Sequence, residues 1–156
     1  MKEDKLSNIS IALSQYVLGQ LPGEKIPKIA IILLENGKEN DEIIELAGMR
    51  NPTMVDVEKK FLKGLDKLEI HLPSIREATI RLAKQISQQI VNREISPYEG
   101  ARKIWWELAN IENVDRRLKA FSGLASEYED TSNNEYRKDY EKQILEEARF
   151  LLEGYE

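Results

Sequence analysis

The feature that most constrains the fold of this chain is the spacing of its apolar residues. They recur at steps of three and four along almost the whole sequence, and sustained alternation of apolar and polar residues is hard to find. A period near 3.6 places such residues on one side of an α-helix, whereas a half-buried strand needs a period of two. The pattern therefore predicts an all-α protein.

Turn and capping residues divide this pattern into about six to seven helices joined by short polar links. We expect a first helix around residues 5–19, a strongly apolar helix in IPKIAIILLENG that stops at Asn36-Gly37, and a brief helix in NDEIIELAG between Asn40 and Gly48. The clearest start is SPYE, with Ser96 as the N-cap, proline at the first helical position and glutamate three residues after the cap.

The length of 156 residues is common for one domain and allows a sizeable core without disulfides or metal. We therefore expect a single compact helical bundle over residues 1–156. The sequence also allows a division of this bundle near His71-Pro73, into sub-bundles 1–71 and 72–156.

Composition limits the partners and the compartment. A formal net charge of −5 disfavours general attraction to DNA or anionic lipid and favours a basic partner. The chain has no cysteine, and no apolar run approaches the length that spans a bilayer. We expect a cytoplasmic protein that does not enter a membrane.

The sequence commits the chain to no catalytic chemistry. His71 is the only histidine and reads as a surface or boundary residue, and no phosphate loop or dinucleotide fingerprint is present. The pairs EIIE and DKLE resemble the acidic pairs of all-helical nucleotide pyrophosphohydrolases, but that family expects Glu-x-x-Asp in the second pair. We therefore expect a protein that is not an enzyme and holds no cofactor or metal.

Two adjacent tryptophans occur in the helix that follows Ser96. Helical residues advance by about 100°, so Trp105 falls in one sector with Ala101, Ile104 and Leu108, and we expect it in the core. Trp106 falls on another side, which it shares with the residues Arg102 and Glu99. Either Trp106 packs on a neighbouring helix with the Arg102 guanidinium over its ring, or the two residues anchor a binding partner.

Nine of the eleven aromatic residues lie beyond residue 90, and several are tyrosines near Glu127, Glu129 and Asp130. Tyrosine among carboxylates suits a hydrated interface with a basic protein. The alternative is that Tyr128, Tyr136 and Tyr140 are half-buried flanks of core stripes, with their hydroxyl groups in solvent.

Residues 35–62 resemble the helix-turn-helix output domain of bacterial response regulators, through Gly37, Asn40, Glu42-Ile43, Gly48 and Thr53. The resemblance implies a first helix at 40–47 and a recognition helix from Thr53. The residues nearest DNA would then be Arg50, Asn51, Thr53 and Lys60. However, residues 22–70 carry eight basic against ten acidic residues, whereas a DNA reader needs cations to replace counterions.

From residue 94 onward, the blocks GARKIWWEL, FSGLASEYED and YEKQILEEAR resemble an uncharacterised family of small helical bacterial proteins. This resemblance implies a helical fold and a bacterial or phage origin, and no activity. The sequence favours a non-enzymatic interaction protein, such as an acidic inhibitor or immunity-type protein that binds a basic bacterial protein. Trp106 and Arg102 would anchor the partner, and Glu99, Glu127, Glu129 and Asp130 would attract it. The alternative is a DNA-binding regulator with a helix-turn-helix at about 37–68, and a homodimer is compatible with both.

Overall fold

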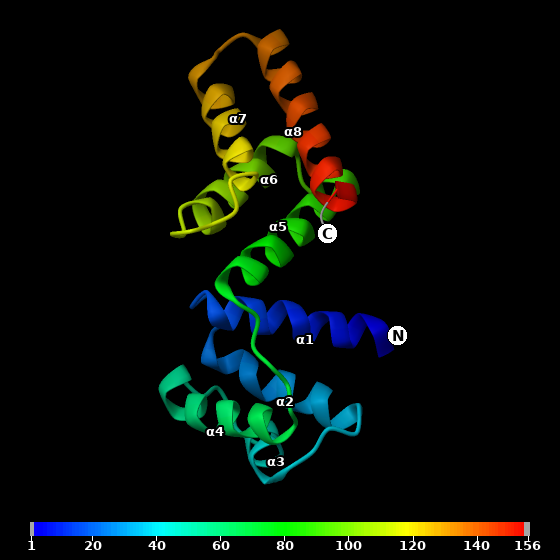
Figure 1. Cartoon of the computed structure of the whole chain (residues 1–156), viewed down its shortest axis with the longest axis vertical. Helices are drawn as coiled ribbons and strands as arrows, with labels where there is room; N and C mark the ends of the chain where they lie inside the picture. Colours follow the sequence, from blue (N-terminus) through cyan, green and yellow to red (C-terminus); the bar gives the residue numbers. More distant parts are fainter. Residues whose placement is uncertain (1, 155–156) are drawn as a thin grey trace. The chain divides into compact units, whose positions relative to one another are not determined.

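The computed structural model describes residues 2–154, and that part of the chain is all-α (Figure 1). It contains eight α-helices, one or two more than the sequence predicted, and no strand. The residues divide into two compact units, Met1–Ser74 and Ile75–Glu156. The sub-bundles that the sequence suggested within one bundle are 1–71 and 72–156. Among the described helices, none is long and apolar enough to cross a membrane.

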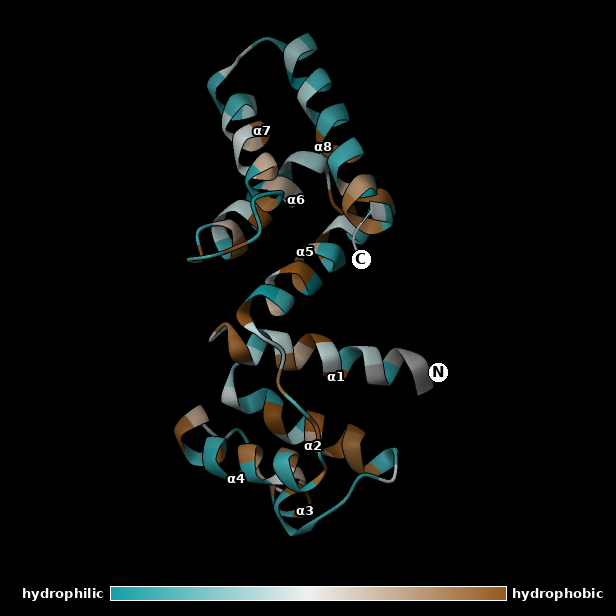
Figure 2. Cartoon of the chain, viewed as in Figure 1, coloured by the Kyte–Doolittle hydropathy of each residue, from teal (hydrophilic) through white to brown (hydrophobic). Residues whose placement is uncertain are grey.

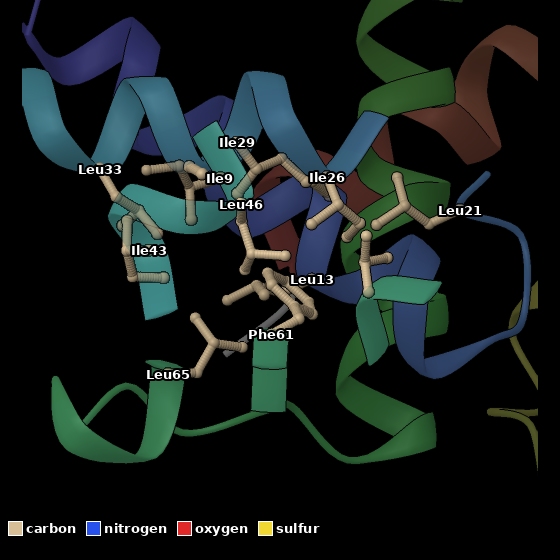
Figure 3. Packing of buried hydrophobic residues seen from close by; sticks show 13 residues of the cluster. Ile9, Leu13, Leu21, Ile26, Ile29, Leu33, Ile43, Leu46, Phe61 and Leu65 are labelled. Carbon is tan, nitrogen blue, oxygen red and sulfur yellow. The ribbon is translucent and has the colours of Figure 1, made fainter. Parts of the chain in front are cut away.

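The N-terminal unit is built from four α-helices and one 3-10 turn. These elements are α1 (Lys2–Val17), η1 (Gly23–Lys25), α2 (Ile26–Glu35), α3 (Asp41–Ala47) and α4 (Met54–Lys67). Its core gathers apolar side chains from all four helices, with Ile26, Ile43 and Phe61 almost fully buried (Figure 3). The Phe61 and Tyr16 rings pack in a T-shaped arrangement, with centroids 5.5 Å apart.

Local capping fixes the ends of these helices close to the predicted positions. The α2 helix ends in a Schellman motif, because the Gly37 amide donates to the Leu34 carbonyl and the Lys38 amide to the Leu33 carbonyl. Gly37 adopts a φ of 74°, which costs glycine little. The Asn40 side chain accepts from the Ile43 amide and so starts α3, as predicted.

The C-terminal unit is built around α8, which contacts α5, α6 and α7. Its elements are α5 (Ile75–Val91), α6 (Pro97–Ile104), the π-helical turn η2 (Trp105–Ala109), α7 (Leu118–Asp130) and α8 (Asn134–Gly154). Ile104, Leu118 and Ile144 are fully buried and bring these helices into one core. Much of α8 is hydrophilic, and α2 in the other unit is largely hydrophobic (Figure 2).

Candidate protein-binding surface

The start of α6 is held in place by a cap and by close packing. The Ser96 hydroxyl accepts a hydrogen bond from the Glu99 amide at 3.1 Å, and Pro97 takes the first helical position, as predicted. A Cβ atom on Gly100 would lie 2.4 Å from two atoms of the Ile90 side chain. The α6 backbone therefore packs directly on α5, and glycine is what allows it.

The two tryptophans lie where the helix widens into a π turn. Trp105 is only half-buried, so the prediction that it belongs to the core was wrong, although Ala101, Ile104 and Leu108 of the same sector are fully buried. Trp105 is the first residue of η2, the π-helical turn that runs to Ala109.

Trp106 is 63% exposed, which overturns the interpretation that it packs on another helix of the bundle. Its ring centroid lies 5.5 Å from that of Trp105, with the two planes tilted by 39°. A tryptophan left this exposed forgoes the stabilisation that burial of its large ring would give. Its exposure is compatible with the other interpretation, in which it anchors a partner.

A shallow hollow of about 350 Å³ surrounds this ring, and we call its lining the Trp106 surface. The lining residues are Glu99, Arg102, Lys103, Trp106 and Glu107. The structure therefore brings together three of the predicted site residues, Glu99, Arg102 and Trp106. Lys103 and Glu107 were missed, although their spacing of four residues from Glu99 and from each other places them on one side of the helix.

Arg102 is engaged with α7. Its Nε atom lies 3.8 Å from Oε1 of Glu129, and the same oxygen accepts a hydrogen bond of 2.6 Å from the Tyr98 hydroxyl. This hydrogen bond is the main cause that raises the pKa of Tyr98 above its ordinary value, with burial as a second cause. Glu129 thus joins α7 to the Trp106 surface through Arg102.

Tyrosines and acids of α7 and α8 form a second set of contacts. The Tyr128 ring stacks on Tyr98 at 4.2 Å and lies 4.9 Å from the Arg137 guanidinium carbon. Tyr128 and Tyr140 are half-buried, as the core-flank interpretation expects, but Tyr136 is 58% exposed, so that interpretation was wrong for Tyr136. The Tyr140 hydroxyl donates to Glu127 at 3.4 Å. Burial first, then Glu127, raises the pKa of Tyr140.

The remaining acidic residues lie outside the Trp106 surface. Glu127 lines a separate groove between α7 and α8, and Asp130 is exposed at the last residue of α7. The predicted acidic set is therefore divided among three places on the unit.

The residues that the alternative assigns to DNA lie around the start of α4. The observed bounds of α3 and α4 agree with the helices that the helix-turn-helix resemblance implies, and Arg50 and Asn51 are exposed in the loop between them. Thr53 forms a reciprocal capping box with Asp56, since its amide donates to the carboxylate at 2.9 Å and its hydroxyl accepts from the Asp56 amide. The bonds from the Thr53 backbone and hydroxyl lower the pKa of Asp56, so a carboxylate occupies the helix start where a phosphate would bind.

Three of the four lysines of α4 are paired with carboxylates of α3. Lys60 binds the Glu45 carboxylate, and Lys67 donates to both oxygens of Glu42 at 2.8 and 2.9 Å, with Lys63 at 3.5 Å. The hydrogen bond from Lys67 is the main cause that lowers the pKa of Glu42 to about 2. Carboxylates of the same unit therefore compete with DNA for these cations.

The acidic pairs do not assemble into a metal centre. Glu42 and Glu45 are paired with lysines, and within residues 2–154 no group of three or more His, Cys, Asp or Glu side chains lies close enough to hold a metal ion. His71 is exposed near the end of the N-terminal unit, as predicted.

Comparison with protein-family models, with curated proteins and with solved structures found no match for this chain.

Proposed function

We propose that the chain is a non-enzymatic protein-binding protein, in its most concrete form an acidic inhibitor or immunity-type protein for a basic bacterial protein. The observation that carries the proposal is Trp106, which is 63% exposed in a hollow lined by two carboxylates, Glu99 and Glu107, and two cations, Arg102 and Lys103. Tryptophan and arginine are enriched among residues that dominate binding energy.

The π turn at this position adds support. Single π turns inside α-helices are frequent at functional sites, and here the turn begins at Trp105 and leaves the adjacent ring in solvent. The net charge of −5 would speed the approach of a basic protein and impose a salt dependence on the association rate.

The first test is affinity capture from a bacterial lysate with the purified full chain, in one arm treated with nuclease. A single basic protein retained in both arms supports the proposal and supplies a complex for measurement. Retention that disappears with nuclease, with nucleic acid in the eluate, contradicts it.

The second test separates binding from folding. Trp106→Ala should weaken the captured complex by at least about tenfold, which corresponds to about 1.4 kcal/mol, and should leave thermal stability nearly unchanged because the ring is mostly exposed. Phe150→Ala is the matched control, since Phe150 is 58% exposed on α8 and does not line the Trp106 surface. Equal effects of the two variants on affinity would show that Trp106 does not contribute to the interface.

A second candidate function is DNA binding by the N-terminal unit, favoured by the agreement of α3 and α4 with the predicted helix bounds. It predicts affinity for duplex DNA that falls steeply with salt and with loss of Arg50 or Lys60. Affinity that is insensitive to salt would exclude it.

A further inference from the structure

The loop between η2 and α7 contributes to a hollow that is rich in arginine. Its volume is about 380 Å³, and its lining residues are Arg76, Asn113, Val114, Asp115, Arg116 and Arg117, all within the C-terminal unit. Three guanidinium groups against one carboxylate leave an excess of two positive charges. This excess contrasts with the chain as a whole, which carries a net charge of −5.

The Asp115 carboxylate binds two of the arginines that line this hollow. Its Oδ2 atom accepts a hydrogen bond of 2.9 Å from Nη2 of Arg76, and its Oδ1 atom lies 3.9 Å from Nε of Arg117 and accepts from the Arg117 amide at 3.0 Å. The Asp115 side chain is only 7% exposed, while those of Arg76 and Arg117 are 67% and 49% exposed. The carboxylate therefore lies beneath two guanidinium groups that remain accessible from solvent.

Arg116 adds a third guanidinium to the same hollow. It is exposed, and within the described part of the chain no ion pair is formed by it. Each guanidinium carries five N–H donors in a planar fork, and the bond from Arg76 to Asp115 uses one donor of Arg76.

We propose that this hollow binds a phosphate monoester. Arginine forks match the oxygens of a phosphoryl group and bind them in pairs. A monoester carries nearly two negative charges at neutral pH, which equals the excess of positive charge in the hollow. A simple carboxylate offers one charge and two oxygens, and Asp115 already supplies that group. The volume leaves room for a small organic group on the phosphate. This site is separate from the Trp106 surface and does not depend on the proposed function.

The experiment is a titration of the full chain, labelled with ¹⁵N, with phenyl phosphate, inorganic phosphate and acetate at constant ionic strength. The signals followed are the backbone amides of residues 113–118 and the Nε–Hε groups of the three arginines. Arg116→Gln is the test variant, because the Arg116 side chain forms no ion pair within the described residues. Lys119→Gln is the matched control, since Lys119 is an exposed cation on the first turn of α7 that does not line the hollow.

We expect saturable shifts with phenyl phosphate, weaker binding of inorganic phosphate and no saturation with acetate. Loss of one charge-assisted hydrogen bond should weaken phenyl phosphate binding about tenfold in Arg116→Gln, and Lys119→Gln should change it by less than about twofold. Shifts that do not saturate, acetate binding as tight as phosphate, or equal losses in the two variants would overturn the proposal. Unchanged amide spectra of both free variants would show that they fold alike.

Discussion

Substitution by alanine should have opposite effects on stability at two glycines of the C-terminal unit. Gly100 lies inside α6 and Gly123 inside α7, so alanine should improve the helix propensity at both positions by about 1 kcal/mol. The difference lies in the space around each residue. An added Cβ atom at Gly123 meets nothing within 4 Å, whereas at Gly100 it lies 2.4 Å from both Cγ1 and Cδ1 of Ile90.

The cost at Gly100 follows from Ile90. Ordinary contacts of a Cβ atom begin near 3.4 Å, so the overlap is close to one ångström. Ile90 is 1% exposed and its branched side chain has few rotamers available in a helix, so α5 and α6 must separate. Overpacking of this kind costs about 1–3 kcal/mol, which exceeds the gain in propensity. We expect Gly100→Ala to destabilise the protein by about 1 kcal/mol and Gly123→Ala to stabilise it by about 1 kcal/mol.

The assay is thermal unfolding of the full chain followed by tryptophan fluorescence, together with urea titration. For a chain of 156 residues, a change of 1 kcal/mol shifts the midpoint by about 2–4 °C, so the two variants should lie on opposite sides of the wild type. A Gly100→Ala variant as stable as the wild type would show that α6 does not pack on Ile90 as described. A Gly123→Ala variant less stable than the wild type would show that the outer side of α7 is covered.

Three further predictions concern single side chains. Glu42→Gln should lower the melting temperature at pH 7. Because the pKa of Glu42 in the folded protein is about 2 against an ordinary value of 4.5, the difference from wild type should shrink as the pH falls from about 4.5 towards 2. A difference in melting temperature that stays constant from pH 2 to 7 would contradict the pairing with Lys67. Ser96→Ala should cost about 1 kcal/mol in urea unfolding through loss of the α6 cap, and Ser96→Gly should recover most of it. Phe61→Ala should cost about 3–5 kcal/mol, because Phe61 is 1% exposed at the centre of the N-terminal core; a loss below 1 kcal/mol in calorimetry would place it outside that core.

The features that the sequence predicted correctly depend on neighbours along the chain. Hydrogen bonds that span three to five residues set the helix caps at Asn40 and Ser96 and the helix end at Gly37. The residue types at these short spacings can be recognised in the amino-acid sequence. The all-α class follows from the apolar period for the same reason.

The features that were missed depend on contacts between helices. The π-helical turn that begins at Trp105 has no signal in residue spacing, and the half-burial of Trp105 depends on how η2 packs against α6 and α7. The pairing of Lys60 and Lys67 with acids of α3 joins residues 15 and 25 positions apart. Such pairs require the tertiary arrangement of α3 and α4, which a single sequence does not supply. The hollow at Arg76 likewise joins residues 39 positions apart.

Both tryptophans of the chain lie in η2. Indole emission excited at the red edge of the absorption band therefore comes from the C-terminal unit alone, and the N-terminal unit contributes only tyrosine and phenylalanine absorption. The two rings lie 5.5 Å apart, close enough for their excited states to couple, so near-ultraviolet circular dichroism is sensitive to their mutual orientation. A ligand that covers the Trp106 ring would alter the near-ultraviolet circular dichroism. Binding at the Trp106 surface can therefore be followed on the protein without an added label.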